Sequence, residues 1–163
     1  MEKERLKFCI ERFDHYYDSV NNKSAVFLGL STFIVGGLVA AYPSVMNLVN
    51  CGAPVHIMML VVIGLGLAIM IIVVMASTPF LTANTDSIHY FGSISCMTKD
   101  QYCNKSSITL TEEDELTDLR EQVHQLSCGL TNKFKRLKLA GRLFTLQFYL
   151  FIPLVLLIIC NLK

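Results

Sequence analysis

The feature that most constrains this chain is a long run without charge. Between Lys23 and Asp86 there is no Asp, Glu, Lys or Arg, although the chain has 163 residues. A helix needs about 20 apolar residues to cross the ~30 Å hydrocarbon core of a bilayer, so the run has room for two membrane spans. We place them at residues 25–42 and 55–76, joined by an external hairpin loop at 43–54 that contains Pro, Asn and Gly. The sequence therefore predicts a membrane protein.

A third apolar stretch, residues 143–162, ends the chain. Pro153 inside it is compatible with a membrane helix. Lysine and arginine are frequent in residues 1–24 and 77–142 and absent from the 43–54 loop, and cytoplasmic loops carry such an excess. We therefore expect a cytoplasmic N-terminal helix at 1–24, a cytoplasmic segment at 77–142, and a C-terminus on the outer side.

Two cytoplasmic segments carry apolar residues at helical spacing. The stripes are Leu6, Ile10, Phe13, Tyr17 and Val20 in one, and Leu116, Leu119, Val123, Leu126 and Leu130 in the other. The second helix is expected to begin at about residue 112, with Thr111 and Asp114 as a reciprocal cap. Because both helices run towards the membrane, we expect them to pack in parallel as a stalk. Residues 80–110 fit either a short helix or a strand-like clip.

The predicted fold is therefore an all-α membrane protein with three transmembrane helices. Its cytoplasmic stalk is formed by the N-terminal helix and by the helix that precedes the last span.

A polar flank beside the first stripe is a candidate ligand site. Arg12, Tyr16 and Lys23 lie at helical spacing and place two cations and one aromatic ring on the same side. Two cations suit a phosphate, and a tyrosine ring can stack on a base. Arg120 and His124 form a similar flank on the second stalk helix. The alternative is that Arg12 pairs with a neighbouring acid and that Lys23 reaches the lipid head groups.

Two further groups of residues belong to the spans and their borders. Small residues allow close helix approach, within one chain or between chains; they are Gly29, Gly36, Gly37 and Ala40 in the first span and Gly64 and Ala68 in the second. Basic residues just inside the bilayer are interpreted as a topology anchor attracted to anionic lipids; they are Lys133, Lys135, Arg136, Lys138 and Arg142.

Motifs of catalysis are missing from the sequence. It has no Gly-rich phosphate loop, no His-Glu-x-x-His and no nucleophile elbow, and its four histidines are scattered. Cys96 and Cys103 do not have the spacing of a zinc site. We predict no catalytic residue, no metal and no cofactor, so the protein is not expected to be an enzyme. The net charge of +1 gives no indication of a nucleic-acid partner.

Four segments carry further motifs: "ERFDHYYDSVNNKSAVFLGLSTFIVGG", "SIHYFGSIS", "LTEEDELTDLREQVHQLSCGL" and "NKFKRLKLAGRLF". In order, spacing and three-span layout they resemble the Pycsar transmembrane effectors of bacterial antiphage defence. The matching positions are Arg12, Phe13, Asp14, Tyr16, Asn22 and Lys23, then Tyr90, Phe91 and Gly92, then Lys133, Lys135, Arg136 and Lys138. One departure is Ser93, where the resemblance leads us to expect an acid.

This resemblance implies a two-gene system. A partner cyclase senses phage and makes a cyclic pyrimidine nucleotide, cyclic UMP or cyclic CMP. The effector then impairs inner-membrane integrity, and the infected cell dies before phage spread. On this basis Arg12, Lys23 and Arg120 would hold the cyclic phosphate, and Tyr16 or Tyr90 would stack on the base. Since three helices cannot enclose a pore alone, a homo-oligomer is expected.

Two other functions stay open. One is a channel-like or toxin module that oligomerises constitutively, which predicts damage without any nucleotide. The other is a membrane scaffold that recruits a cytosolic partner, which predicts no leakage under any ligand.

Overall fold

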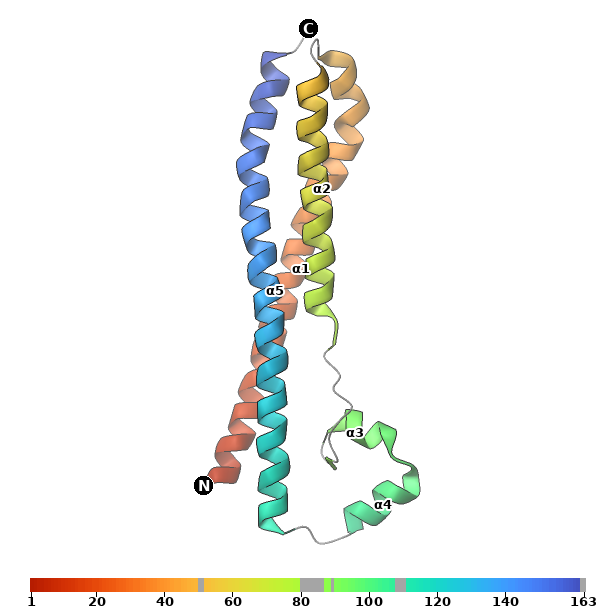
Figure 1. The fold of residues 1–163 in the computed structure, drawn as a ribbon, viewed down its shortest axis with the longest axis vertical. Helices are drawn as coiled ribbons and strands as arrows, with labels where there is room; N and C mark the ends of the chain where they lie inside the picture. Colours follow the sequence, from red (N-terminus) through yellow and green to blue (C-terminus); the bar gives the residue numbers. More distant parts are fainter. Residues whose placement is uncertain (50–51, 80–86, 89, 108–110, 162–163) are drawn as a thin grey trace. The chain divides into compact units, whose positions relative to one another are not determined.

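The computed structural model describes every residue except 50–51, 80–86, 89, 108–110 and 162–163, and it describes only the backbone of Phe91. Five helices account for most of the described chain (Figure 1): α1 (Glu2–Leu48), α2 (Gly52–Ser77), α3 (Phe91–Cys96), α4 (Lys99–Ser107) and α5 (Glu112–Cys160). No strand occurs in this part of the chain. Three helices, α1, α2 and α5, are long and apolar enough to cross a membrane. The all-α class with three spans is thus confirmed.

The helices extend further than the sequence indicated. α1 continues past Tyr42 and through Pro43 to Leu48, and α2 begins at Gly52. Most of the region expected as a loop at 43–54 is therefore helical. A proline is tolerated inside a membrane helix because neighbouring groups can satisfy the carbonyl that it leaves free, and the residues after Pro43 are again compatible with a helix. In the 80–110 region, the described residues form α3 and α4 rather than a strand.

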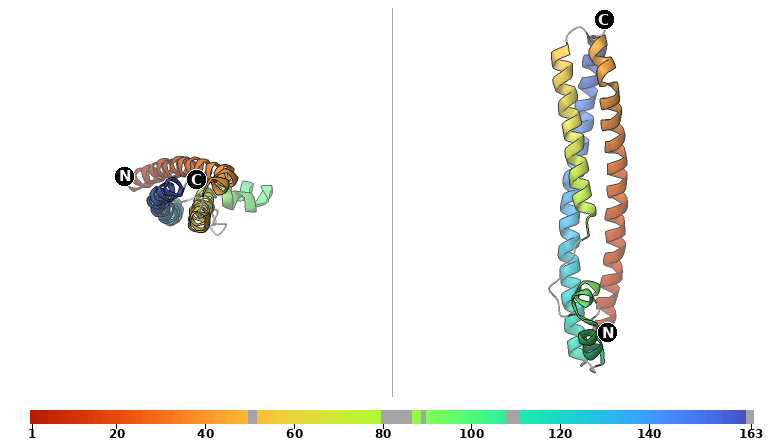
Figure 2. Two further views of the ribbon diagram at one scale, coloured as in Figure 1. Left: turned by 90° about the horizontal axis from the view of Figure 1, so that it is seen from above. Right: turned by 90° about the vertical axis from the view of Figure 1, so that its right-hand side faces the viewer.

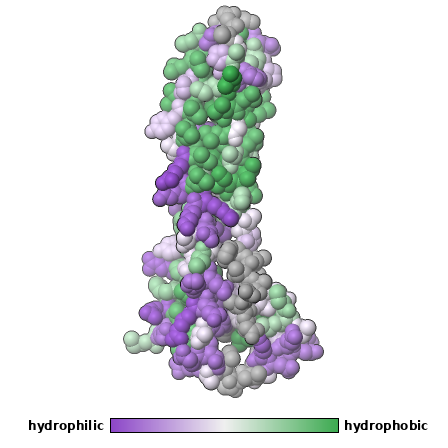
Figure 3. All heavy atoms as spheres, viewed as in Figure 1, coloured by the Kyte–Doolittle hydropathy of each residue, from purple (hydrophilic) through white to green (hydrophobic). Residues whose placement is uncertain are grey.

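The chain divides into two compact units, which share α1 and α5. The polar unit comprises Met1–Asp18 and Pro79–Asn132, and the membrane unit comprises Ser19–Thr78 and Lys133–Lys163. Figure 3 shows mostly hydrophobic side chains on the surface of the membrane unit and mostly hydrophilic ones on the polar unit.

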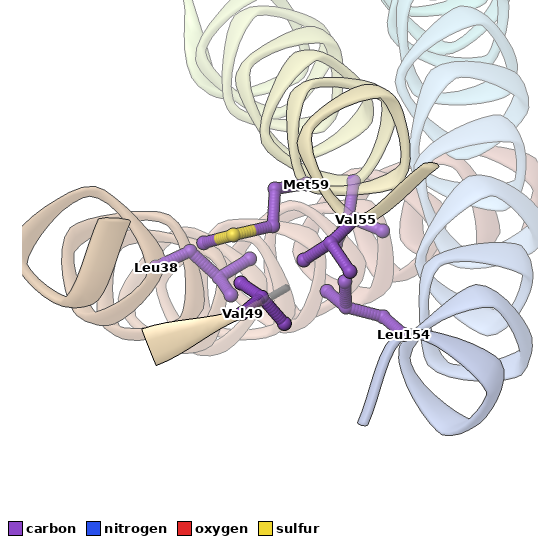
Figure 4. Packing of buried hydrophobic residues seen from close by; sticks show 6 residues of the cluster. Leu38, Val49, Val55, Met59 and Leu154 are labelled. Atoms are coloured by element: carbon purple, nitrogen blue, oxygen red, sulfur yellow. The ribbon is translucent and has the colours of Figure 1, made fainter. Parts of the chain in front are cut away.

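In the membrane unit the three long helices lie side by side (Figures 1 and 2). Leu38 of α1, Met59 of α2 and Leu154 of α5 point towards one another in Figure 4, together with Val49 and Val55. A second cluster, with Ile69, Val73, Ala140 and Phe144, continues this core. In lipid such contacts stabilise by van der Waals packing, because the tails are as apolar as the side chains.

In the polar unit α1 and α5 form a parallel pair. Lys3 Nζ contacts Glu115 Oε2 at 2.6 Å, and further along both helices the Tyr17 hydroxyl donates to the Leu126 carbonyl at 2.9 Å. Residue numbers rise together along the two helices, which means that they run in the same direction. Parallel packing of the expected stalk helices is therefore seen within this unit.

α5 begins with the expected reciprocal cap. The Thr111 hydroxyl donates to Asp114 Oδ2 at 2.5 Å, and the Asp114 backbone N–H donates to Thr111 Oγ1 at 3.2 Å. The cap satisfies N–H groups that the first helical turn leaves without a partner. These bonds hold the pKa of Asp114 below its usual value.

Candidate functional site

A buried serine organises the polar unit around α5. Ser87 is 3% exposed, and its hydroxyl donates to Asp118 Oδ2 at 2.9 Å. The same oxygen accepts hydrogen bonds from Gln122 Nε2 and from the Tyr90 backbone N–H, both at 3.0 Å. Asp118 and Gln122 are one turn apart on α5, so this Ser87 cluster docks the segment before α3 onto one face of that helix.

Tyr90 lies directly beside this cluster. Its ring covers Gly92, where an added Cβ would come within 2.6 Å of Tyr90 Cε1. This close approach gives a physical reason for glycine in the Tyr-Phe-Gly motif. Burial, followed by the nearby groups of Asp14, Tyr90 and Cys128, raises the pKa of Tyr17. Elements from α1, the segment before α3, and α5 therefore converge around the two tyrosines.

Arg12 and Tyr16, two of the predicted ligand-binding residues, contact each other. Arg12 Nε donates to the Tyr16 hydroxyl at 3.1 Å, and the guanidinium lies 5.8 Å from the centre of the Tyr16 ring. Both side chains are exposed. A cation held against an exposed aromatic ring is a suitable surface for a phosphate that is linked to a base.

Arg120 is held by two carboxylates. Its Nε and Nη2 donate to the two oxygens of Glu2 at 3.0 and 3.1 Å, and Nη1 donates to Glu113 Oε1 at 2.8 Å. This pairing lowers the pKa of Glu2 and raises that of Arg120. An anion that binds Arg120 through these donors competes with the two glutamates.

The remaining predicted ligand residues lie elsewhere. His124 is exposed, and its Nε2 is 3.9 Å from Cys128 Sγ. Lys23 is exposed and belongs to the membrane unit. Within the described residues, no hydrogen bond joins the Arg12–Tyr16 pair to Arg120 or His124. Within the polar unit, the Arg12–Tyr16 pair and Arg120 therefore make separate sets of contacts.

The basic residues of α5 that were predicted to lie just inside the bilayer fall into two sets. Lys133 is buried, and its Nζ donates to the carbonyls of Ala76 and Thr78, each at 2.8 Å. Arg136 Nη1 donates to the Met75 carbonyl at 2.6 Å. These two cations cap the C-terminus of α2, where carbonyls lack helical partners and the helix dipole is negative. Burial, and to a lesser degree Arg136, lowers the pKa of Lys133.

The other members of that basic group, Lys135, Lys138 and Arg142, are exposed. They fit the predicted role as an anchor to anionic lipids, which stays a prediction.

The small residues predicted for close helix packing have different surroundings. A Cβ added at Gly29, Gly36, Gly37 or Gly64 would meet nothing within 4 Å. Ala40 is exposed and Ala68 half-buried. The four glycines are therefore not sites of close helix contact within this chain.

The close helix contact is instead at Gly66, a residue outside the predicted set. A Cβ there would lie 2.4 Å from Val35 Cγ2 and 2.7 Å from Gln147 Nε2. Gln147 is 1% exposed, and its Nε2 donates to the Val62 carbonyl at 3.1 Å. α1, α2 and α5 meet at this point.

The model of a family described as the Pycsar effector protein domain matches residues 5–160. The chain belongs to this family. No curated protein and no solved structure matches it.

Membership makes this Pycsar effector a bacterial antiphage protein of the membrane, which works with a cyclase system. The family is of a non-enzymatic effector kind. Across the described residues, no group of three or more His, Cys, Asp or Glu side chains is placed to hold a metal ion.

Several residues of this Pycsar effector that hold elements together were missed by sequence reasoning. Ser87, Asp118 and Gln122 are ordinary polar residues in the sequence, and their cluster forms only when the segment before α3 folds onto α5. Gln147 had a visible signal, as an amide inside an apolar run. Polar side chains within spans usually face the bundle interior, and that rule alone could have selected it.

Proposed function

We propose that this Pycsar effector is activated by a cyclic pyrimidine nucleotide, cyclic UMP or cyclic CMP, and then impairs the bacterial inner membrane so that the infected cell dies. The observation that carries the proposal is the family match over residues 5–160, on a chain with three apolar helices. A partner cyclase supplies the nucleotide. The excess of Lys and Arg supports an N-terminus in the cytoplasm, with the polar unit, and a C-terminus in the periplasm.

Ligand binding is assigned to the polar unit. Arg12 with Tyr16 offers a cation beside an aromatic ring, and Tyr90 offers a second ring. Arg120 contributes a guanidinium that is held by Glu2 and Glu113 without ligand. When the nucleotide binds, the guanidinium exchanges a carboxylate partner for the phosphate. The ligand-free and ligand-bound states then differ in their contacts, and a ligand needs such a difference in order to shift an equilibrium. His124 is a further candidate in the polar unit, whereas Lys23, a residue of the membrane unit, is a candidate from the sequence alone.

Coupling to the membrane unit is assigned to α1 and α5, because each helix runs without interruption through residues of both units. A changed packing of these helices in the polar unit can then change the arrangement of the spans. To move such an equilibrium from 1:99 to 99:1, the nucleotide must favour one state by about 5.5 kcal/mol. Sharing this demand among several subunits lowers the differential affinity that each site must supply.

The function is tested by leakage. Purified protein is placed in liposomes that hold a dye and potassium, and cyclic UMP, cyclic CMP and the cyclic purine nucleotides are added in turn. Leakage with a cyclic pyrimidine alone is expected. Leakage without nucleotide would favour the constitutive module instead, and an intact membrane under every nucleotide would contradict the proposal and favour the scaffold.

The ligand site is tested separately by calorimetry with the same nucleotides. Arg12→Ala and Arg120→Ala are expected to weaken binding, whereas Glu113→Gln is expected to strengthen it because it releases one of the carboxylates that compete for Arg120. Glu112→Gln, which changes the neighbouring exposed acid, serves as the matched control. Full binding and toxicity in Arg12→Ala and Arg120→Ala would show that the nucleotide is held elsewhere.

A further inference from the structure

Three polar side chains are buried inside the membrane unit with atoms that lack a hydrogen-bond partner. Ser24 and Ser31 of α1 are 0% exposed, and Gln147 of α5 is 1% exposed. The atoms in question are Ser24 Oγ, Ser31 Oγ and Gln147 Oε1, and no described residue bonds to them. In a closed hydrocarbon environment each such atom is unfavourable, because nothing replaces the water that it loses.

Other hydroxyl groups of the same helices are satisfied. Thr32, next to Ser31, is exposed and donates to the Leu28 carbonyl at 2.8 Å, and Thr145 donates to the Gly141 carbonyl at 3.0 Å. A bond to the preceding turn is the usual way in which a membrane helix accommodates a hydroxyl. The buried serines do not make this bond.

The three side chains form successive levels along the bundle. Ser24 and Ser31 are seven residues apart on one face of α1, which separates them by roughly 10 Å. Val35, one turn beyond Ser31, and the Gln147 amide both lie beside Gly66. A cleft of ≈ 50 Å³ lies beside that amide, lined by Ile34, Gln147, Phe148 and Phe151. The cleft is larger than the about 10–15 Å³ that one water needs, but its exposed lining is apolar, so it does not by itself bind water.

Polar groups also stand at both ends of this series. Lys133 and Arg136 donate to the last carbonyls of α2 at one end of the membrane unit. The Tyr42 hydroxyl contacts His56 Nδ1 near the other end of α1 and the start of α2.

We propose that the face bearing Ser24, Ser31 and Gln147 binds water and small hydrated ions, and that it lines the leakage path once the spans move apart. The inference rests on the proposed membrane-impairing function and adds the residues that the path uses. In the resting state the two serines are closed off from solvent. In the activated state water supplies the hydrogen bonds that the three side chains lack.

The first test compares ion leakage from potassium-loaded liposomes with cyclic UMP or cyclic CMP. The variants are Ser31→Ala and the triple variant Ser24→Ala, Ser31→Ala, Gln147→Leu, with Thr32→Ala and Thr145→Ala as matched controls. The triple variant is expected to leak about tenfold more slowly per molecule than wild type, as a barrier raised by ~1.4 kcal/mol implies. The controls are expected to stay within about twofold of wild type, which corresponds to less than ~0.5 kcal/mol.

The second test does not depend on the folding of the triple variant. Ser31→Cys and Thr32→Cys are made in a chain whose natural cysteines are replaced, and a water-soluble thiol reagent is added with and without nucleotide. Ser31→Cys is expected to react only with nucleotide, and Thr32→Cys in neither state. Suppose that wild type leaks with nucleotide, that the triple variant leaks at the same rate, and that Ser31→Cys stays unreactive. This result would overturn the inference but not the proposed function. A wild-type protein that never leaks would overturn the proposed function and the inference together.

Discussion

Gly66 lies where the membrane unit leaves no room for a side chain. An added Cβ would overlap Val35 and the Gln147 amide, at 2.4 and 2.7 Å. Overpacking of a well-filled core typically costs about 1–3 kcal/mol. We expect Gly66→Ala to unfold at a lower temperature than wild type in detergent micelles, and to weaken the bond from Gln147 to Val62.

Gly64→Ala is the matched control for that change. It lies in the same helix, and its Cβ would meet nothing within 4 Å. Its unfolding temperature is expected to equal or exceed that of wild type, because alanine favours a helix over glycine. Equal destabilisation by both substitutions would show that helix flexibility, not the contact with Val35 and Gln147, is the reason for glycine.

At the same scale, Glu2 makes the polar unit sensitive to acid. Its bond with Arg120 lowers its pKa, and a carboxylate whose folded-state pKa is lowered contributes stability that is present above its unfolded pKa and lost as the pH falls through the folded one. We expect thermal stability, followed by circular dichroism, to fall between about pH 5 and pH 3. Arg120→Gln should lose part of this dependence, while Asp114, capped by Thr111, retains the rest. An unchanged acid sensitivity in Arg120→Gln would contradict this role of Glu2.

At the scale of elements, the end of α2 is held by a cation from another helix. Lys133→Met keeps most of the volume but removes the donors to the Ala76 and Thr78 carbonyls. A buried polar group left without its partner costs about 1–3 kcal/mol. We expect faster amide hydrogen exchange over the last two turns of α2. Lys135→Met removes an exposed lysine two residues away and should leave exchange unchanged. Similar exchange in the two variants would indicate that α2 ends stably without the Lys133 cap.

The same elements show what the sequence could and could not predict. The spans and the start of α5 follow from local signals, namely hydropathy and the Thr111–Asp114 cap, and both are confirmed. The helical extension of α1 past Pro43 was missed because a turn-forming composition does not break a helix in every context. The contacts of Lys133 and Gln147 were missed because their partners are backbone carbonyls distant in sequence. Every residue type has such a carbonyl, so the sequence does not indicate which one accepts.

For the whole molecule, the outward glycines favour assembly from several copies. Gly29 and Gly36 lie seven residues apart on α1, and a side chain at either would meet open space in the single chain. In lipid, such residues let helices of neighbouring subunits approach closely. Since three spans cannot enclose a path alone, we expect the leakage rate to rise more steeply than linearly with the protein-to-lipid ratio.

Gly36→Leu tests whether these glycines form the contact between copies. The leucine side chain should block close approach, flatten the dependence of leakage on protein density, and reduce chemical cross-linking between subunits in the bilayer, while nucleotide binding stays intact because the polar unit is unchanged. Val39→Leu, an exposed substitution in the same helix, is the control and should behave as wild type. Leakage that rises linearly with density in both variants and in wild type would mean that one chain acts alone, and that the outward glycines serve another purpose.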